Sequence, residues 1–163
     1  MNDYVIQLLN KYRDRGLFLD TVLFVLLAVG SYNRKLIGTD KRLSGYVPED
    51  FDTLLLFIQN FKNIITAPNI ITEVSNLTKH LLGTEFSKEF VRQIDLMTEE
   101  YIPSKQISNS DLFFRVGITD AVVAQLSRGK FLVLTDDLPL VGQLEKLRID
   151  VVNFNHIRVL NWT

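Results

Sequence analysis

The sequence contains no cysteine, which excludes a disulfide framework, a thiolate nucleophile and every cysteine-ligated zinc or iron–sulfur centre. It also lacks an excess of charge of either sign, because 18 basic and 19 acidic residues give a net charge of -1. A domain that binds nucleic acid over a broad surface is usually strongly basic. Any contact of this chain with nucleic acid must therefore be local.

Several common functional motifs are missing as well. The sequence has no P-loop, no HExxH and no GxSxG, so the usual nucleotide-binding, zinc-protease and serine-hydrolase patterns are excluded. The most apolar run, residues 17–29, contains Asp20 and is shorter than the ~20 residues that a membrane-spanning helix needs. The first four residues lack the basic region and apolar stretch of a secretory signal. We expect a cytoplasmic protein without a membrane partner.

The apolar pattern predicts a single α/β domain over residues 1–163. An apolar content of 47% in 163 residues is enough for one continuous core, and no segment resembles a linker. Short apolar runs alternate with longer stretches of helical periodicity, which is typical of an α/β fold with a largely parallel sheet. The predicted strands are 17–19, 63–67, 131–134 and 150–154. The predicted helices are 4–12, 21–28, 48–61, 69–81, 84–101, 111–116, 119–126 and 138–147.

Two of the predicted strands end in acidic residues. Asp20 follows the first strand, and Asp136 and Asp137 follow the strand 131–134. Ligand sites of open parallel sheets lie beyond the carboxyl ends of the strands, so a functional site is expected there. The structural alternative is helix capping, because Asp and Thr are good N-caps: Thr21 is expected to cap the following helix, and Asp137 on its own fits a cap.

Glu73 and Asp120 are the other candidate acids. Glu73 lies at the rim of the apolar stripe of its predicted helix, where a carboxylate can reach over the end of the sheet; the alternative is a solvated helix edge. Asp120 is in the first turn of its helix, where the helix dipole favours an acid, and Thr119 is expected to be the cap. Carboxylates without cysteine or grouped histidine suit Mg²⁺ or Mn²⁺, and such sites commonly serve phosphodiester hydrolysis.

Four segments occur in an order that resembles the PIN-domain family: FLDTVLF at 18–24, APNIITEVSNL at 67–77, GITDAVVAQL at 117–126 and VLTDDLPL at 133–140. The resemblance spans residues 17–155. It implies a three-layer α/β/α sandwich with a central, mainly parallel sheet. It also implies a Mg²⁺- or Mn²⁺-dependent endoribonuclease acting on single-stranded or structured RNA. Many members are toxins of bacterial toxin–antitoxin pairs, so an antitoxin and a homodimer are the protein partners to expect.

The resemblance also implies roles for individual residues. Asp136 would be a second ligand or would position water, while the hydroxyls of Thr21 and Thr135 would orient the first and last acids. Hydrolysis would leave a 5'-phosphate and a 3'-hydroxyl. Four acids would bind the metal and form the catalytic site: Asp20, Glu73, Asp120 and Asp137.

Two features depart from the family pattern. The connection 31–48 is longer and more basic than in the shortest toxin-like members. The family commonly has Asn two residues after the first acid, and this chain has Val22 there. The substitution removes a supporting hydrogen bond. It keeps open the alternative of a non-catalytic PIN-fold module that binds RNA or protein.

The connection 31–48 is the best candidate for an RNA-binding surface. It is irregular and basic, and Tyr32 and Tyr46 are available in it for base stacking. The alternative is an ordinary solvated loop. Residues outside this surface are expected to have structural roles: His80 and His156 at the surface or as caps, and Trp162 in packing or an interface. The candidate RNA-binding residues are Arg34, Lys35, Lys41 and Arg42.

Overall fold

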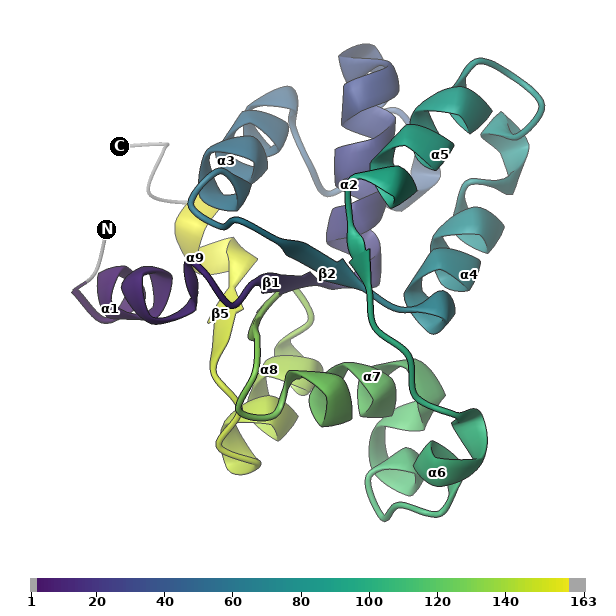
Figure 1. Ribbon diagram of the computed structural model, residues 1–163. Helices are drawn as coiled ribbons and strands as arrows, with labels where there is room; N and C mark the ends of the chain where they lie inside the picture. The colour runs from purple at the N-terminus through teal and green to yellow at the C-terminus, as the bar shows by residue number, and fades with distance from the viewer. Residues whose placement is uncertain (1–2, 159–163) are drawn as a thin grey trace.

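Short strands form the centre of the molecule in the computed structural model, which describes residues 3–158. Within this part of the chain five strands pair in parallel, in the order β3-β2-β1-β4-β5 (Figure 1). Their bounds are β1 (Leu17–Leu19), β2 (Ile64–Thr66), β3 (Thr98–Glu99), β4 (Leu132–Thr135) and β5 (Val151–Asn153). The predicted α/β fold with a mainly parallel sheet is confirmed.

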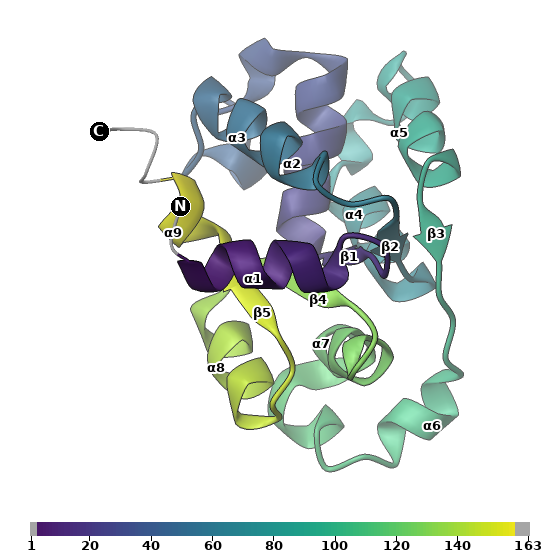
Figure 2. The ribbon, with the colours of Figure 1, turned by 60° about the vertical axis from the view of Figure 1, so that its left-hand side comes forward.

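Helices cover both faces of the sheet and make a three-layer α/β/α sandwich (Figures 1 and 2). On one face lie α2 (Thr21–Tyr32), α3 (Pro48–Ile58), α4 (Pro68–Leu77) and α5 (Phe86–Asp95), and on the other lie α7 (Phe113–Ser127) and α8 (Leu138–Lys146). The remaining helices are α1 (Asp3–Tyr12), α6 (Ser104–Ser108) and α9 (Phe154–Arg158). The layer architecture agrees with the expectation from the family resemblance.

The middle of the core is built by β1 and α2. Every residue of β1 is fully buried, and α2 is apolar on all sides because it lies between the sheet and its helical neighbours α3, α4 and α5. The close packing is most evident at Gly30, where a Cβ atom would lie 2.4 Å from Cδ2 of Phe51 in α3. The absence of a side chain at Gly30 lets the two helices approach.

A pair of glycine substitutions tests this packing. We expect Gly30→Ala to lower the free energy of unfolding by about 1–3 kcal/mol, because the new methyl group displaces the rigid Phe51 ring. Gly142→Ala in α8 is the matched control, since no atom lies within 4 Å of its Cβ position. It should raise stability by roughly 0.5–1 kcal/mol through helix propensity. Urea unfolding measures both, and equal stability of the two variants would contradict the packing argument.

The order of the strands creates a switch point beside β1. From β1 the chain continues outward through β2 and β3 on one side, whereas β4 and β5 lie on the other side. The connections that leave β1 and β4 therefore diverge, and ligand sites of open α/β sheets are commonly built beyond the carboxyl ends of strands at such a point. The acids that follow these two strands lie at this switch point.

Some predicted boundaries were wrong. The helix predicted over 84–101 ends at Asp95, and Thr98–Glu99 forms the edge strand β3 instead. Such a short, exposed strand has no apolar alternation that would reveal it. The predicted break between the segments 111–116 and 119–126 is present, because Gly117 interrupts α7 with a φ of 80° that suits glycine; the first segment begins at Phe113 instead of 111. The cap of α2 is Asp20, not Thr21.

Other expectations concern the surface and the ends of the chain. His156 is exposed, as predicted. No helix within residues 3–158 combines the length and the apolar character needed to cross a bilayer. The expectation for Trp162 lies outside the described residues.

Candidate active site

Asp20 occupies the end of β1 and is held by two hydrogen bonds. Its side chain is buried; Oδ1 accepts from the Thr21 amide at 2.7 Å and Oδ2 accepts from the Thr135 hydroxyl at 2.5 Å. Burial, together with the charges of Asp136 and Asp137, raises the pKa of Asp20 to about 6 against the opposing effect of these hydrogen bonds. The first acid is thus fixed to the end of the neighbouring strand β4.

Glu73 joins three helices at the same end of the sheet. It lies in α4, is half-buried, and accepts hydrogen bonds from the hydroxyls of Thr21 in α2, at 3.0 Å, and Thr119 in α7. The pairing differs from the expectation, since Thr21 orients Glu73 and Thr135 orients Asp20. Thr119 was expected only as a cap, and its contact with Glu73 was missed.

Asp120 lies in α7 next to Thr119, and the charges of three other acids raise its pKa. Burial raises the pKa of Asp120 to about 7, and the negative charges of Asp20, Asp137 and Glu73 contribute to the rise. No hydrogen bond from the described part of the chain contributes to this shift in the pKa of Asp120. Four carboxylates that are far apart in the sequence are therefore brought within electrostatic reach of one another.

Asp137 completes this group. Its Oδ1 caps α8 by accepting from the Leu140 amide at 3.1 Å, as the capping alternative proposed, and its own amide donates to the Thr135 hydroxyl at 3.1 Å. Its side chain is nevertheless exposed and its charge raises the pKa of both Asp20 and Asp120. We call Asp20, Glu73, Asp120 and Asp137 the acid cluster.

Asp136 faces another part of the molecule. Its Oδ2 accepts a hydrogen bond from the hydroxyl of Tyr46, and its main-chain oxygen accepts from Asn155 Nδ2 at 2.9 Å. Burial and the Asp136 carboxylate raise the pKa of Tyr46, so the phenol keeps its proton and donates. Asp136 therefore anchors the segment before α3, and its charge is not among the causes that act on Asp120.

The expectation that Tyr46 stacks on bases was wrong. Its ring is buried between Phe154 and the guanidinium of Arg158, which lies 5.1 Å from the ring centroid. Tyr32 also packs internally, with its ring at a steep angle to Phe86 and a centroid distance of 5.7 Å. Neither ring is presented freely to a ligand.

The donor set of the acid cluster suits a hard cation, since carboxylate oxygens are the preferred ligands of Mg²⁺ and Mn²⁺. Within residues 3–158, however, no three acidic or histidine side chains converge into an assembled metal site. Mg²⁺ usually keeps several waters and binds proteins through one or two carboxylates, so three converging ligands are not required. The chemistry of the residues therefore fits the cation.

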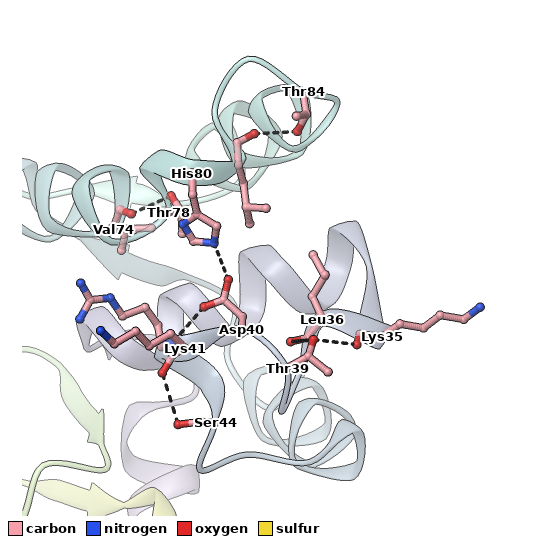
Figure 3. Close-up of polar contacts among 12 residues, drawn as sticks. Lys35, Leu36, Thr39, Asp40, Lys41, Ser44, Val74, Thr78, His80 and Thr84 are labelled. Carbon is pink, nitrogen blue, oxygen red and sulfur yellow. Dashed lines mark hydrogen bonds and ion pairs between the residues drawn. The ribbon is translucent and has the colours of Figure 1, made fainter.

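The four candidate RNA-binding residues do not form one surface. Arg34, in the 3-10 helix η1 (Arg34–Leu36), makes a two-pronged ion pair with Asp52 at 2.7 and 2.8 Å. Lys35 extends away from Asp40 and Lys41 (Figure 3). Lys41 and Arg42, in η2 (Lys41–Leu43), line an open groove shared with the end of α4. The connection was predicted as one surface, and only its second half meets this groove.

Exposed apolar side chains near the strand ends were missed by the sequence analysis. Tyr101 is 71% exposed and follows β3, while Leu138 is 62% exposed and follows Asp137. Phe114 is 79% exposed at the start of α7, the helix that contains Asp120. Their exposure depends on tertiary structure and has no signal in a single sequence.

Comparisons of the chain with protein-family models, curated protein sequences and solved structures gave no significant match.

Proposed function

We propose that the protein is a Mg²⁺- or Mn²⁺-dependent endoribonuclease that hydrolyses phosphodiester bonds, as its resemblance to the PIN-domain family implies. The observation that carries the proposal is the effect of Asp20, Glu73 and Asp137 on the pKa of Asp120. Three acids from distant motifs act on a fourth at the switch point of a parallel sheet, where ligand sites are commonly built. Strongly shifted carboxyl pKa values at such a position are typical of functional sites.

The acid cluster supplies the oxygen ligands for the cation. Asp20 and Glu73 are oriented in advance by the hydroxyls of Thr135, Thr21 and Thr119, which reduces the reorganisation needed when a cation binds. Asp120 and Asp137 are held by fewer hydrogen bonds, because none acts on the pKa of Asp120 and only Oδ1 of the exposed Asp137 is engaged, with the Leu140 amide. A bound Mg²⁺ or Mn²⁺ lowers the pKa of water and stabilises negative charge on the transferred phosphoryl group.

Single-stranded RNA is the substrate that the surroundings favour. Tyr101, which follows β3, and Phe114, in the helix that contains Asp120, are exposed aromatic residues, and aromatic side chains commonly stack on unpaired bases. The net charge of -1 argues against extended contact with a duplex backbone.

Cleavage of a fluorescent single-stranded RNA tests the proposal. The wild-type protein is expected to cut in Mn²⁺ or Mg²⁺ and not in EDTA, and an Asp20→Asn/Asp120→Asn variant is expected not to cut. Asn is also a good N-cap, so the change at Asp20 keeps the start of α2. Asp95→Asn, an exposed acid in α5, is the control and should cut like the wild type.

The alternative function is a binding module without catalysis. It is favoured by the lack of an assembled group of three ligands within residues 3–158 and by Val22 at the position where the family has Asn. A folded wild-type protein that binds RNA but cuts it with neither metal would establish this alternative. An antitoxin partner and a homodimer remain proposals that rest on the family resemblance.

A further inference from the structure

A groove with a concentration of positive charge lies between η2 and the end of α4. Its volume is about 660 Å³, and it is open to solvent along one side. One wall comes from the segment around η2, and the other from α4 and the 3-10 helix η3 (Lys79–Leu81), as Figure 3 shows for Lys41, Asp40 and His80. We call it the basic groove; its lining residues are Thr39, Asp40, Lys41, Arg42, Asn76, Leu77, Lys79 and His80.

Asp40 connects the two walls of the basic groove. Its carboxylate is almost fully buried, with 4% of the side chain exposed; Oδ1 accepts from the Arg42 amide at 2.9 Å, and Oδ2 lies 2.5 Å from Nε2 of His80. Both oxygens are therefore used within the protein. The imidazole of His80 is held through one nitrogen, while half of its side chain stays exposed. The contact fixes the distance between the walls.

The other charged residues of the basic groove are cations. Lys41, Arg42 and Lys79 take part in none of the ion pairs between described residues, in contrast to Arg34 with Asp52 and Arg92 with Glu89. Among the described residues, Asp40 is the only acid that lines the basic groove, and its two carboxylate oxygens face the Arg42 amide and the His80 ring. The basic groove therefore has a local excess of positive charge in a protein whose net charge is -1.

The basic groove lies one helical turn from the acid cluster. Asn76 and Leu77 follow Glu73 by three and four residues in α4, so they lie on the same side of the helix. One turn corresponds to about 5.4 Å along the helix axis. A nucleic-acid strand with one phosphate at the acid cluster can therefore place its next phosphates in the basic groove.

We propose that the basic groove binds the phosphates of a single RNA strand on one side of the bond to be cut, with Lys41, Arg42 and Lys79 as the phosphate contacts. The position of the bound strand relative to the cut bond depends on the proposed function, whereas the binding of RNA in the basic groove does not. A pocket of this volume accepts a ligand of drug size, which corresponds to one or two nucleotides of a single strand and not to the width of a duplex.

RNA binding is measured in EDTA, which removes the metal needed for the proposed cleavage, so that binding is tested by itself. A short fluorescent single-stranded RNA is titrated with the wild type and with a Lys41→Ala/Arg42→Ala/Lys79→Ala variant, and fluorescence anisotropy is followed at several salt concentrations. We expect the variant to bind about ten-fold or more weakly. The slope of log affinity against log salt should fall by about 0.7 for each lost phosphate contact.

Three exposed cations elsewhere provide the matched control. An Arg13→Ala/Lys88→Ala/Lys146→Ala variant removes the same charge from outside the basic groove and is expected to bind within about three-fold of the wild type. Urea unfolding verifies that both triple variants are folded. Wild-type affinity in the groove variant, an equal loss in the control, or preferred binding of an RNA duplex would each overturn the proposal.

The outcomes also separate this proposal from the proposed function. Binding that depends on Lys41, Arg42 and Lys79, together with no cleavage in any metal, supports the basic groove and refutes the nuclease. Metal-dependent cleavage together with unchanged binding by the groove variant supports the nuclease and refutes the basic groove.

Discussion

Asp120→Asn is expected to abolish metal-dependent cleavage and, at the same time, to make the protein more stable at pH 8 in the absence of divalent metal. The wild-type carboxyl is half-buried beside three other acids, and its pKa is raised to about 7. At pH 8 it is ionised in an unfavourable place, and the neutral amide removes this cost. Each pKa unit corresponds to about 1.4 kcal/mol, but the partial exposure of Asp120 reduces the effect. We expect a gain of roughly 1–3 kcal/mol.

The raised pKa of Asp120 also makes the free energy of unfolding depend on pH. A carboxyl with a raised pKa in the folded state binds its proton more tightly there than in the unfolded chain. Its contribution to stability is therefore present below about pH 4 and is lost as the pH rises through about 7. Urea unfolding in EDTA at pH 5 and pH 8 should show a larger advantage of Asp120→Asn at pH 8. Asp95→Asn is the control, and a variant less stable than the wild type at pH 8 would contradict the account of repulsion.

Mn²⁺ is expected to raise the thermal stability of the wild type by several degrees, and to have little effect on the Asp20→Asn/Asp120→Asn variant. A ligand at 100 times its dissociation constant stabilises the folded state by about 2.7 kcal/mol, and each kcal/mol corresponds to roughly 2–4 °C at this chain length. Carboxylates must lose their protons to bind metal. Because burial and repulsion raise the pKa of Asp20 and Asp120, the stabilisation should be larger at pH 8 than at pH 5.5.

Thermal unfolding at both pH values, with NaCl added to the control at equal ionic strength, measures the effect of Mn²⁺. An equal rise in wild type and variant would mean that the cation binds outside the acid cluster. An effect that is larger at pH 5.5 would contradict the assignment of these carboxyls as ligands.

The positions of the acids could be predicted because they depend on local patterns. Asp20 and Asp137 follow short apolar strands, and the carboxyl ends of neighbouring parallel strands meet at one edge of the sheet. Glu73 lies in the middle of α4, which follows β2, and Asp120 lies in α7 shortly after the break at Gly117. Periodicity and strand order are therefore enough to indicate that the four acids lie at the same end of the sheet.

The contacts between the side chains could not be predicted in the same way. Thr119 and Tyr46 meet Glu73 and Asp136 across 46 and 90 residues of sequence, and such pairings depend on how the helices pack. The basic connection is irregular, so no periodicity indicates that Lys35 points away from Lys41. The interpretation of this connection as one surface failed for that reason.

The ends of the RNA fragments provide the most direct test of the central claim, that the acid cluster performs metal-dependent hydrolysis. A labelled single-stranded RNA is incubated in Mn²⁺ with the wild type and with Asp120→Asn, and the termini of the products are analysed. The account predicts fragments with 5'-phosphate and 3'-hydroxyl ends from the wild type alone. Fragments with 2',3'-cyclic phosphate ends, or equal cutting by Asp120→Asn, would contradict it.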